Sequence, residues 1–259
     1  MERRTFIKNA PVAVLGTSML SSFSSPKGIL ADREFYELRI YHLRSGGKLS
    51  VYSNYLSKAV IPAMNALGIK NIGVFTEWGK SDPPKLYMLI PYTSPDQMLT
   101  AAQKMAEQPV YKENAAEYLG TSPNNANYSR IENSFMVAFS GIPAMKVPSQ
   151  SERIFEFRNY ESFSEEAGQR KIAMFNEGEL DIFYETGLNP VFFGEVLVGQ
   201  NLPCLSYMLV FKDIEERDAN WEKFIAHPEW KRMSQMPEYA NTVSQVNRTF
   251  LVPTEYSQV

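Results

Sequence analysis

Residues 35–41 read FYELRIY, and residues 154–160 read IFEFRNY. Glu37 and Glu156 take the same place in these two stretches and lie 119 positions apart. Further pairs keep the same order at nearly the same distance: Gly68 with Gly187 and Pro109 with Pro228 at 119, Tyr87 with Tyr207 at 120, and Phe135 with Phe250 at 115. Motifs that recur in order at an almost constant spacing indicate a duplicated domain.

The first copy has the pattern of a strand, a helix, two strands, a helix and a strand. Tyr36, Leu38 and Ile40 alternate with polar residues, as in a strand with one apolar face. Apolar residues at helical spacing follow, with Pro62 as an expected kink or break and Gly68 at the end. The expected elements are a strand at 35–41, a helix at 48–67, strands at 71–78 and 85–92, a helix from 95 that Pro109 interrupts, and a strand at 134–140.

The second copy predicts the same order. Its first helix is expected to begin near Ser162, with a capping box to Glu165, and to end at Gly187. The other expected elements are strands at 153–160, 191–198, 206–212 and 245–251 and a helix from Asp213. Each copy is thus a ferredoxin-like β-α-β-β-α-β unit.

Such a unit leaves one face of its sheet bare, and that face must be buried against another layer. The second copy supplies the layer. We therefore predict an α+β fold in which two tandem ferredoxin-like units, at 33–140 and 152–252, form an α/β barrel of the kind that single-domain proteins build by dimerising. Residues 141–151, which include Pro143 and Pro148, are the expected linker.

Each first strand carries the same alternating polar set: Glu37, Arg39 and Tyr41 in one copy, and Glu156, Arg158 and Tyr160 in the other. We expect both sets to point into the barrel interior or the interface between the sheets. An arginine beside a carboxylate in a cavity could bind an anionic or phenolic molecule, which makes Glu37, Glu156, Arg158 and Tyr160 candidate ligand-binding residues. The alternative is a structural ion-pair cluster, since buried ion pairs are weak evidence of function.

The chain has two histidines, and neither is duplicated. His42 ends the first strand and could act as a general base at a cavity mouth, with Tyr41 and Arg39 as catalytic partners; the alternative is a surface histidine. His227 precedes Pro228 and is expected at a helix end. The single cysteine, Cys204, excludes an intramolecular disulfide and is expected to be buried and inert. These residues have no metal-ligand spacing, so we expect neither a metal nor another cofactor.

Residues 1–31 have the features of an export signal. Arg3, Arg4, Phe6 and Lys8 precede an apolar stretch of 11 residues from 10 to 20, which is too short to span a bilayer. The paired arginines resemble a bacterial twin-arginine signal, with cleavage after Ala31; the alternative is the general secretion route. We therefore expect a periplasmic or secreted protein without stable membrane insertion. A net charge of -3 gives no electrostatic case for nucleic-acid binding.

The first-strand motif, the two-helix layout and the stretch from His227 to Trp230, preceded by Trp221 and Phe224, together resemble the NIPSNAP family. The resemblance covers residues 33–252 and implies the dimeric α/β barrel superfamily. The first copy departs from the pattern at Met98, Gln108 and Tyr111.

The resemblance does not decide the function, because relatives in this superfamily include cofactor-free monooxygenases, haem enzymes and small-molecule degrading enzymes, and a fold hosts many functions. Three hypotheses follow. The protein binds or processes a small organic molecule in the barrel cavity; or it is a cofactor-independent monooxygenase or isomerase; or it is a non-catalytic structural or interaction protein. The partners that we consider are a small-molecule ligand and further copies of the chain in a homo-oligomer.

Overall fold

The computed structural model describes residues 32–45, 49–79, 81–122 and 126–259. They belong to one compact unit, Asp32–Val259. The predicted export signal at 1–31 lies outside the described residues. Within the described part, no helix is both long enough and apolar enough to cross a membrane.

The first repeat follows the predicted order, with two additional short helices after Pro109. Its strands are β1 (Phe35–Leu43), β2 (Gly73–Glu77), β3 (Lys85–Tyr92) and β4 (Tyr128–Ala138). Its helices are α1 (Leu49–Asn54), a π-helical stretch (Tyr55–Val60), α2 (Ile61–Ala66), α3 (Pro95–Glu107), α4 (Pro109–Asn114) and α5 (Ala116–Leu119). The long first helix is split, as predicted, with Pro62 at the second position of α2, where a proline costs no hydrogen bond inside that helix.

The second repeat has the same plan. Its strands are β5 (Ile154–Glu161), β6 (Asn189–Val198), β7 (Cys204–Phe211) and β8 (Gln245–Pro253). Its helical segments are α6 (Glu165–Met174), a π-helical stretch (Phe175–Glu179), α7 (Leu180–Thr186), α8 (Ile214–Ala226), α9 (Pro228–Met233) and a 3-10 turn (Pro237–Tyr239). The cap of α6 is Ser164, whose hydroxyl accepts from the Ala167 amide at 3.1 Å; the prediction of Ser162 was two residues early. Gly187 ends α7 with a φ of 79°, as a glycine at that position predicts.

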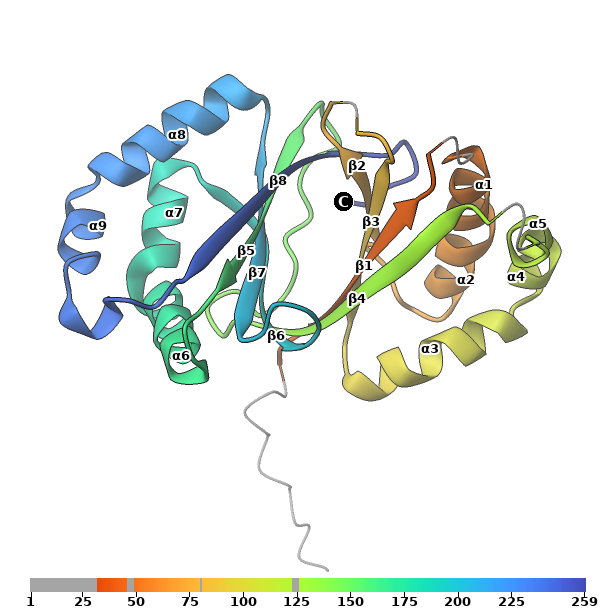
Figure 1. The fold of residues 1–259 in the computed structure, drawn as a ribbon, viewed down its shortest axis with the longest axis horizontal. Coiled ribbons are helices and arrows are strands. Elements are labelled where there is room, and N and C mark those ends of the chain that lie inside the picture. Colours follow the sequence, from red (N-terminus) through yellow and green to blue (C-terminus); the bar gives the residue numbers. More distant parts are fainter. Residues whose placement is uncertain (1–31, 46–48, 80, 123–125) are drawn as a thin grey trace, which may run out of the picture. The chain divides into compact units, whose positions relative to one another are not determined.

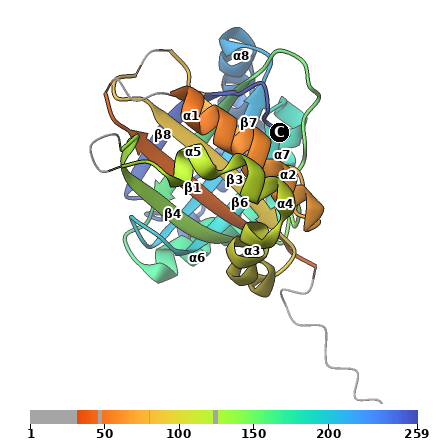
Figure 2. The same cartoon turned by 90° about the vertical axis from the view of Figure 1, so that its right-hand side faces the viewer.

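Eight strands of the described residues close into a barrel in the order β1-β3-β2-β8-β5-β7-β6-β4. All neighbours are antiparallel, and the pairs β2–β8 and β4–β6 join the two repeats. The helices lie outside, α6 to α9 beside the strands of the second repeat and α1 to α5 beside those of the first (Figure 1). Figure 2 looks onto the helices of the first repeat, in front of β1 and β3. The predicted fold, an α+β barrel of two tandem units, is confirmed.

The buried part of the barrel interior consists of apolar side chains. The side chains that fill it come from both repeats and include Tyr36, Leu38, Phe75, Tyr87, Leu89, Met136, Phe155, Phe157, Phe192, Met208 and Leu251. A barrel of eight strands is just wide enough for side chains to fill. The expectation of a ligand cavity between the two sheets is therefore not met within the described residues.

The polar sets on β1 and β5 face the helices. Along β1, Tyr36 and Leu38 belong to the interior cluster, whereas Phe35 and Tyr41 belong to the cluster under the helices. Because side chains alternate along a strand, Glu37 lies on the helix side, and its partners confirm this below. The prediction that these sets point into the barrel was wrong. A buried charge needs hydrogen-bond partners: neighbouring strands supply them to Glu37 through Tyr92 and Asn133, and helix α8 supplies them to Glu156.

The sheet register also corrects one repeat match. Arg39 pairs with Met88, and Arg158 pairs with Tyr207, so Met88 and Tyr207 are equivalent at a shift of 119. The sequence match of Tyr87 with Tyr207 at 120 is off by one residue. Tyr87 lies in the interior cluster, whereas Tyr207 lies under the helices, because a shift of one residue changes the face of a strand.

Candidate functional site

The Glu37 carboxylate is the centre of a buried polar cluster in the first repeat. Arg39 donates to it through Nε at 2.6 Å and Nη2 at 3.0 Å. The Tyr92 hydroxyl donates at 2.8 Å and the Asn133 side-chain amide at 2.7 Å. Burial opposes ionisation of Glu37, but the Arg39 charge and these hydrogen bonds hold its pKa below the ordinary value. Glu37 is therefore an anchored carboxylate with four donors.

The Glu156 carboxylate has an equivalent but more highly charged environment. Arg158 donates through Nε at 2.7 Å, and Arg217 of α8 donates through Nε at 2.9 Å and Nη2 at 3.0 Å. The Trp221 indole, also from α8, donates at 2.9 Å and stacks on the Arg158 guanidinium at 3.9 Å from ring centroid to Cζ. Burial again opposes ionisation, and the two arginines and the indole hold the pKa of Glu156 below its ordinary value.

Arg217 and Trp221 have no counterparts in the first repeat. Asp213 caps α8 and Ser94 caps α3, each through its side chain, and these caps are 119 positions apart. The same shift places Met98 at the position of Arg217 and Ala102 at the position of Trp221.

The predicted catalytic residues do not converge on one site. His42 lies on the barrel side of β1, where its Nε2 is 2.9 Å from Glu132 Oε1. Arg39 and Tyr41 lie on the opposite face, under the helices. Residues 41 and 42 are neighbours in the chain, and neighbours in a strand point to opposite faces. The four predicted ligand-binding residues likewise separate, with Glu37 in the first repeat and Glu156, Arg158 and Tyr160 in the second.

His42 lies at one end of the barrel, where the inner face becomes polar. Glu132 also accepts from Arg130 Nε at 2.7 Å, and these contacts lower its pKa although burial acts in the opposite direction. The equivalent pair in the second repeat is Glu161 with Asn247, at 2.7 Å. His227 caps the start of α9 and contacts Glu185 at 3.1 Å, consistent with the helix-end position expected for it.

A buried lysine–glutamate pair was missed in the sequence. Lys171 donates to Glu179 at 2.6 Å across the turn that contains the π-helical stretch, and its ammonium lies 4.2 Å from the Phe175 ring centroid. Burial raises the pKa of Glu179, and the nearby Lys171 offsets this in part. The helix is interrupted between the two residues, where Gly178 has a non-helical backbone inside the π-helical stretch, and a regular 3.6-residue pattern does not predict such a break.

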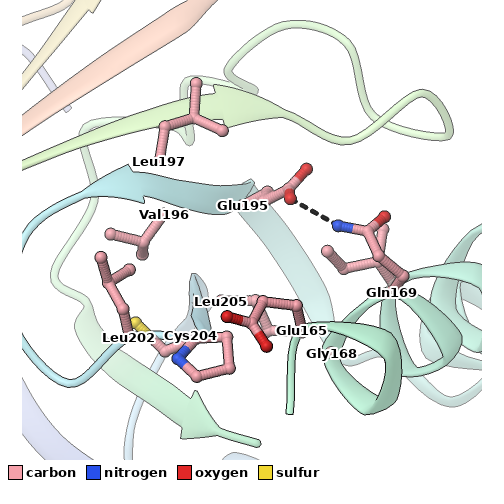
Figure 3. Close-up of a pocket in the computed structure, with 11 residues that line it drawn as sticks. Glu165, Gly168, Gln169, Glu195, Val196, Leu197, Leu202, Cys204 and Leu205 are labelled. Carbon is pink, nitrogen blue, oxygen red and sulfur yellow. Dashed lines mark hydrogen bonds between the residues drawn. The ribbon is translucent and has the colours of Figure 1, made fainter.

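A cavity lies in the second repeat, between α6 and the β6–β7 hairpin (Figure 3). Its volume is about 280 Å³. Most of its wall is apolar, formed by Ile172, Val196, Leu197, Leu202, Pro203 and Leu205. The polar lining residues are Glu165, Gln169, Glu195 and Cys204.

One carboxylate of this pocket is held in place. Gln169 of α6 donates to Glu195 of β6 at 2.6 Å, the contact drawn in Figure 3. The free cysteine, Cys204, is buried at the pocket, and burial raises the pKa of its thiol, so it stays protonated near neutral pH. The pocket can therefore accept a hydrogen bond or a positive charge at Glu195 and bury apolar groups elsewhere. Sequence analysis missed it because its lining comes from a helix and a distant hairpin.

Within the described residues, no group of three or more His, Cys, Asp or Glu side chains is arranged to hold a metal ion.

Several solved structures share this fold. A candidate monooxygenase from Lactobacillus acidophilus aligns with a TM-score of 0.58 at 10% identity, over 85% of this chain and 94% of the other. A candidate monooxygenase from Fusobacterium nucleatum aligns at 0.57 and 11% identity, over 85% and 92%. An anthrone oxidase-like protein aligns at 0.50 and 9% identity, over 87% and 93%. At such identities the likeness concerns the fold alone.

The sequence itself identifies the family. No curated protein matches the chain at a significant level. The NIPSNAP family profile matches twice, at residues 36–140 and 155–258, and these two ranges coincide with the two halves of the barrel. The chain belongs to the NIPSNAP family and carries two copies of its domain in tandem.

Proposed function

We propose that the protein binds a small, mainly apolar organic molecule in the pocket between α6 and the β6–β7 hairpin. The observation that carries this proposal is the pocket itself, about 280 Å³ with apolar walls and a fixed carboxylate. Ligand sites are typically concave, mostly apolar and supplied with a few placed polar groups. Glu195 selects a ligand that presents an N–H or O–H group or a positive charge.

Ligand discovery and pocket blocking test this function together. Native mass spectrometry of the protein purified from its source should reveal a retained small molecule. Leu202→Trp adds bulk at the pocket rim, where Leu202 is exposed, and should reduce binding of that molecule or of a fragment found by screening. The matched control is Val198→Trp, an exposed position on the same hairpin outside the pocket lining. Equal binding by both variants would place the ligand elsewhere.

A second candidate function is proton transfer at the polar end of the barrel. It is favoured by the contact of His42 with Glu132 at 2.9 Å, since a carboxylate beside an imidazole orients the ring. A cofactor-independent monooxygenase or isomerase needs such a base, and two of the fold neighbours are candidate monooxygenases. His42→Gln should abolish turnover of a substrate and leave its binding intact; unchanged turnover removes this candidate.

We further propose that residues 1–31 direct export through the twin-arginine route. The paired arginines at positions 3 and 4, followed by a short apolar stretch, support this. Replacing both arginines by lysine should keep the protein in the cytoplasm, as measured by fractionation, whereas continued export would favour the general secretion route.

A further inference from the structure

We propose that the partly exposed guanidinium of Arg39, in the first repeat, is a second binding site and takes a planar aromatic ring of a small-molecule ligand. This site is separate from the pocket under α6 and does not depend on it.

In the second repeat, the stacking of an aromatic ring on the equivalent arginine is already present within the chain. Trp221 covers the guanidinium of Arg158 with 3.9 Å between ring centroid and Cζ. Arginine stacks readily on aromatic faces, because the ring quadrupole attracts the cation and both groups are flat. The contact comes from the chain's own helix α8, so in this repeat the face is already occupied.

The first repeat has the arginine without the ring. The position equivalent to Trp221 is Ala102 of α3, which is exposed. The side chain of Arg39 is 23% exposed, whereas that of Arg158 is 11% exposed. Among the described residues, no aromatic ring lies over Arg39, whereas Trp221 stacks on Arg158 and the Phe250 ring lies more than 5 Å from the Cζ atoms of Arg217 and Arg248.

The exposed guanidinium is also fixed in orientation before any ligand arrives. Two hydrogen bonds to Glu37 hold its plane, and Tyr92 and Asn133 hold Glu37 in turn. A ligand that stacks there therefore costs little side-chain entropy. Because Glu37 balances the charge of Arg39 and already accepts four hydrogen bonds, the favoured ligand is a neutral or weakly polar aromatic compound and does not need to be an anion.

Indole is the direct probe, since it is the ring that covers Arg158 in the second repeat. Binding to the full chain is followed by chemical-shift changes of the Arg39 Nε–H and the Ala102 amide, with an expected affinity on the order of 1 mM. Ala102→Trp supplies the ring from α3 and should weaken indole binding at this site by about tenfold or more. Gln103→Trp, on the next exposed position of α3, is the matched control and should leave binding unchanged.

Trp221→Ala gives the complementary result. It vacates the face of Arg158, so it should add one indole-binding event to those of the unmodified protein, seen as a new chemical-shift change of the Arg158 Nε–H. Indole should also raise the thermal midpoint of this variant more than that of the unmodified protein. If Trp221→Ala does not fold, the Ala102→Trp comparison still decides. Indole signals that persist unchanged in Ala102→Trp, or no signals at Arg39 in the unmodified protein, overturn the proposal.

Discussion

In the first repeat, Glu37 faces one guanidinium and two neutral donors; in the second, Glu156 faces two guanidinium groups and an indole. The number of hydrogen bonds is the same, because each carboxylate accepts four. The two clusters differ in their charge and in their exposure to solvent. The second cluster carries one more positive charge, and Trp221 shields it from solvent.

This comparison separates the contacts that both repeats share from those that only the second repeat has. The carboxylate–arginine pair on the first strand occurs in both repeats, which fits the structural ion-pair role weighed for it from the sequence. The partners supplied by α8 occur once and close the second cluster. The first cluster, without them, stays partly open at Arg39, where a ligand can take the place of a side chain.

The largest effect is expected when the second carboxylate is neutralised. Glu156→Gln leaves the buried Arg158 without its counter-charge and leaves Arg217 with only the exposed Asp218, which should lower the free energy of unfolding by about 3–5 kcal/mol. Glu37→Gln leaves a single, more exposed guanidinium and should cost less, about 1–3 kcal/mol. Urea unfolding of both variants near neutral pH measures this order. Equal costs would mean that the second arginine adds nothing to the cluster.

Removing the ring that covers Arg158 should have the next largest effect. Trp221→Ala loses the contacts with Arg158, Phe183 and Phe224 and the hydrogen bond to Glu156, so we expect a loss of about 3 kcal/mol in unfolding free energy. Trp78→Ala is the matched control, since Trp78 is 52% exposed and should cost less than about 1 kcal/mol. A similar loss in both variants would contradict a covering role for Trp221.

The pH dependence of stability should follow the two carboxylates. Their folded-state pKa values lie below the ordinary value of 4.5, so the unfolded chain binds more protons as the solution is acidified. The stability that they contribute is present above about pH 4.5 and is lost as the pH falls through the folded-state values.

The difference in unfolding free energy between the unmodified protein and Glu156→Gln should therefore shrink as the pH is lowered from about 6 through the folded-state pKa of Glu156. Urea unfolding across this range measures the trend. A difference that grows on acidification would show that the pKa of Glu156 is raised in the fold.

The fold could be predicted because both copies carry the same periodic spacing of apolar residues. The alternation around Glu37, the helix stop at Gly68 and the repeat spacing predicted strands, helices and a two-unit barrel, and the register of β1 with β3 follows that alternation. Which face turns inward could not be predicted, because both faces of β1 are buried. Hydrophobic burial on both sides removes the contrast that normally orients a strand.

The polar cluster around Glu156 was harder to predict, since the partners of this carboxylate come from a distant helix. Nothing near Glu156 in the sequence points to Arg217 and Trp221, which are 61 and 65 residues away. A signal did exist: the second helices of the two repeats differ at these positions, with Met98 and Ala102 in the first. Departures between repeats mark where side chains do something that the shared scaffold does not require.

The smallest effect is expected at the buried pair of Lys171 with Glu179, which also distinguishes the repeats. The equivalent positions in the first repeat are Tyr52 and Val60, both buried and without charge. Ion pairs of this kind contribute little net stability, because desolvation offsets their attraction. Replacing both residues together, Lys171→Met with Glu179→Leu, should therefore change the unfolding free energy by less than about 1 kcal/mol.

The single variant Glu179→Leu is the control for that pair, since it leaves the ammonium buried alone and should be clearly less stable than the double variant. A double variant that loses as much as the single one would show that the pair holds the π-helical turn of the second repeat in place. The first repeat forms a π-helical stretch at the equivalent place, where Tyr52 and Val60 are buried without charge, which is why we expect the charges to be dispensable.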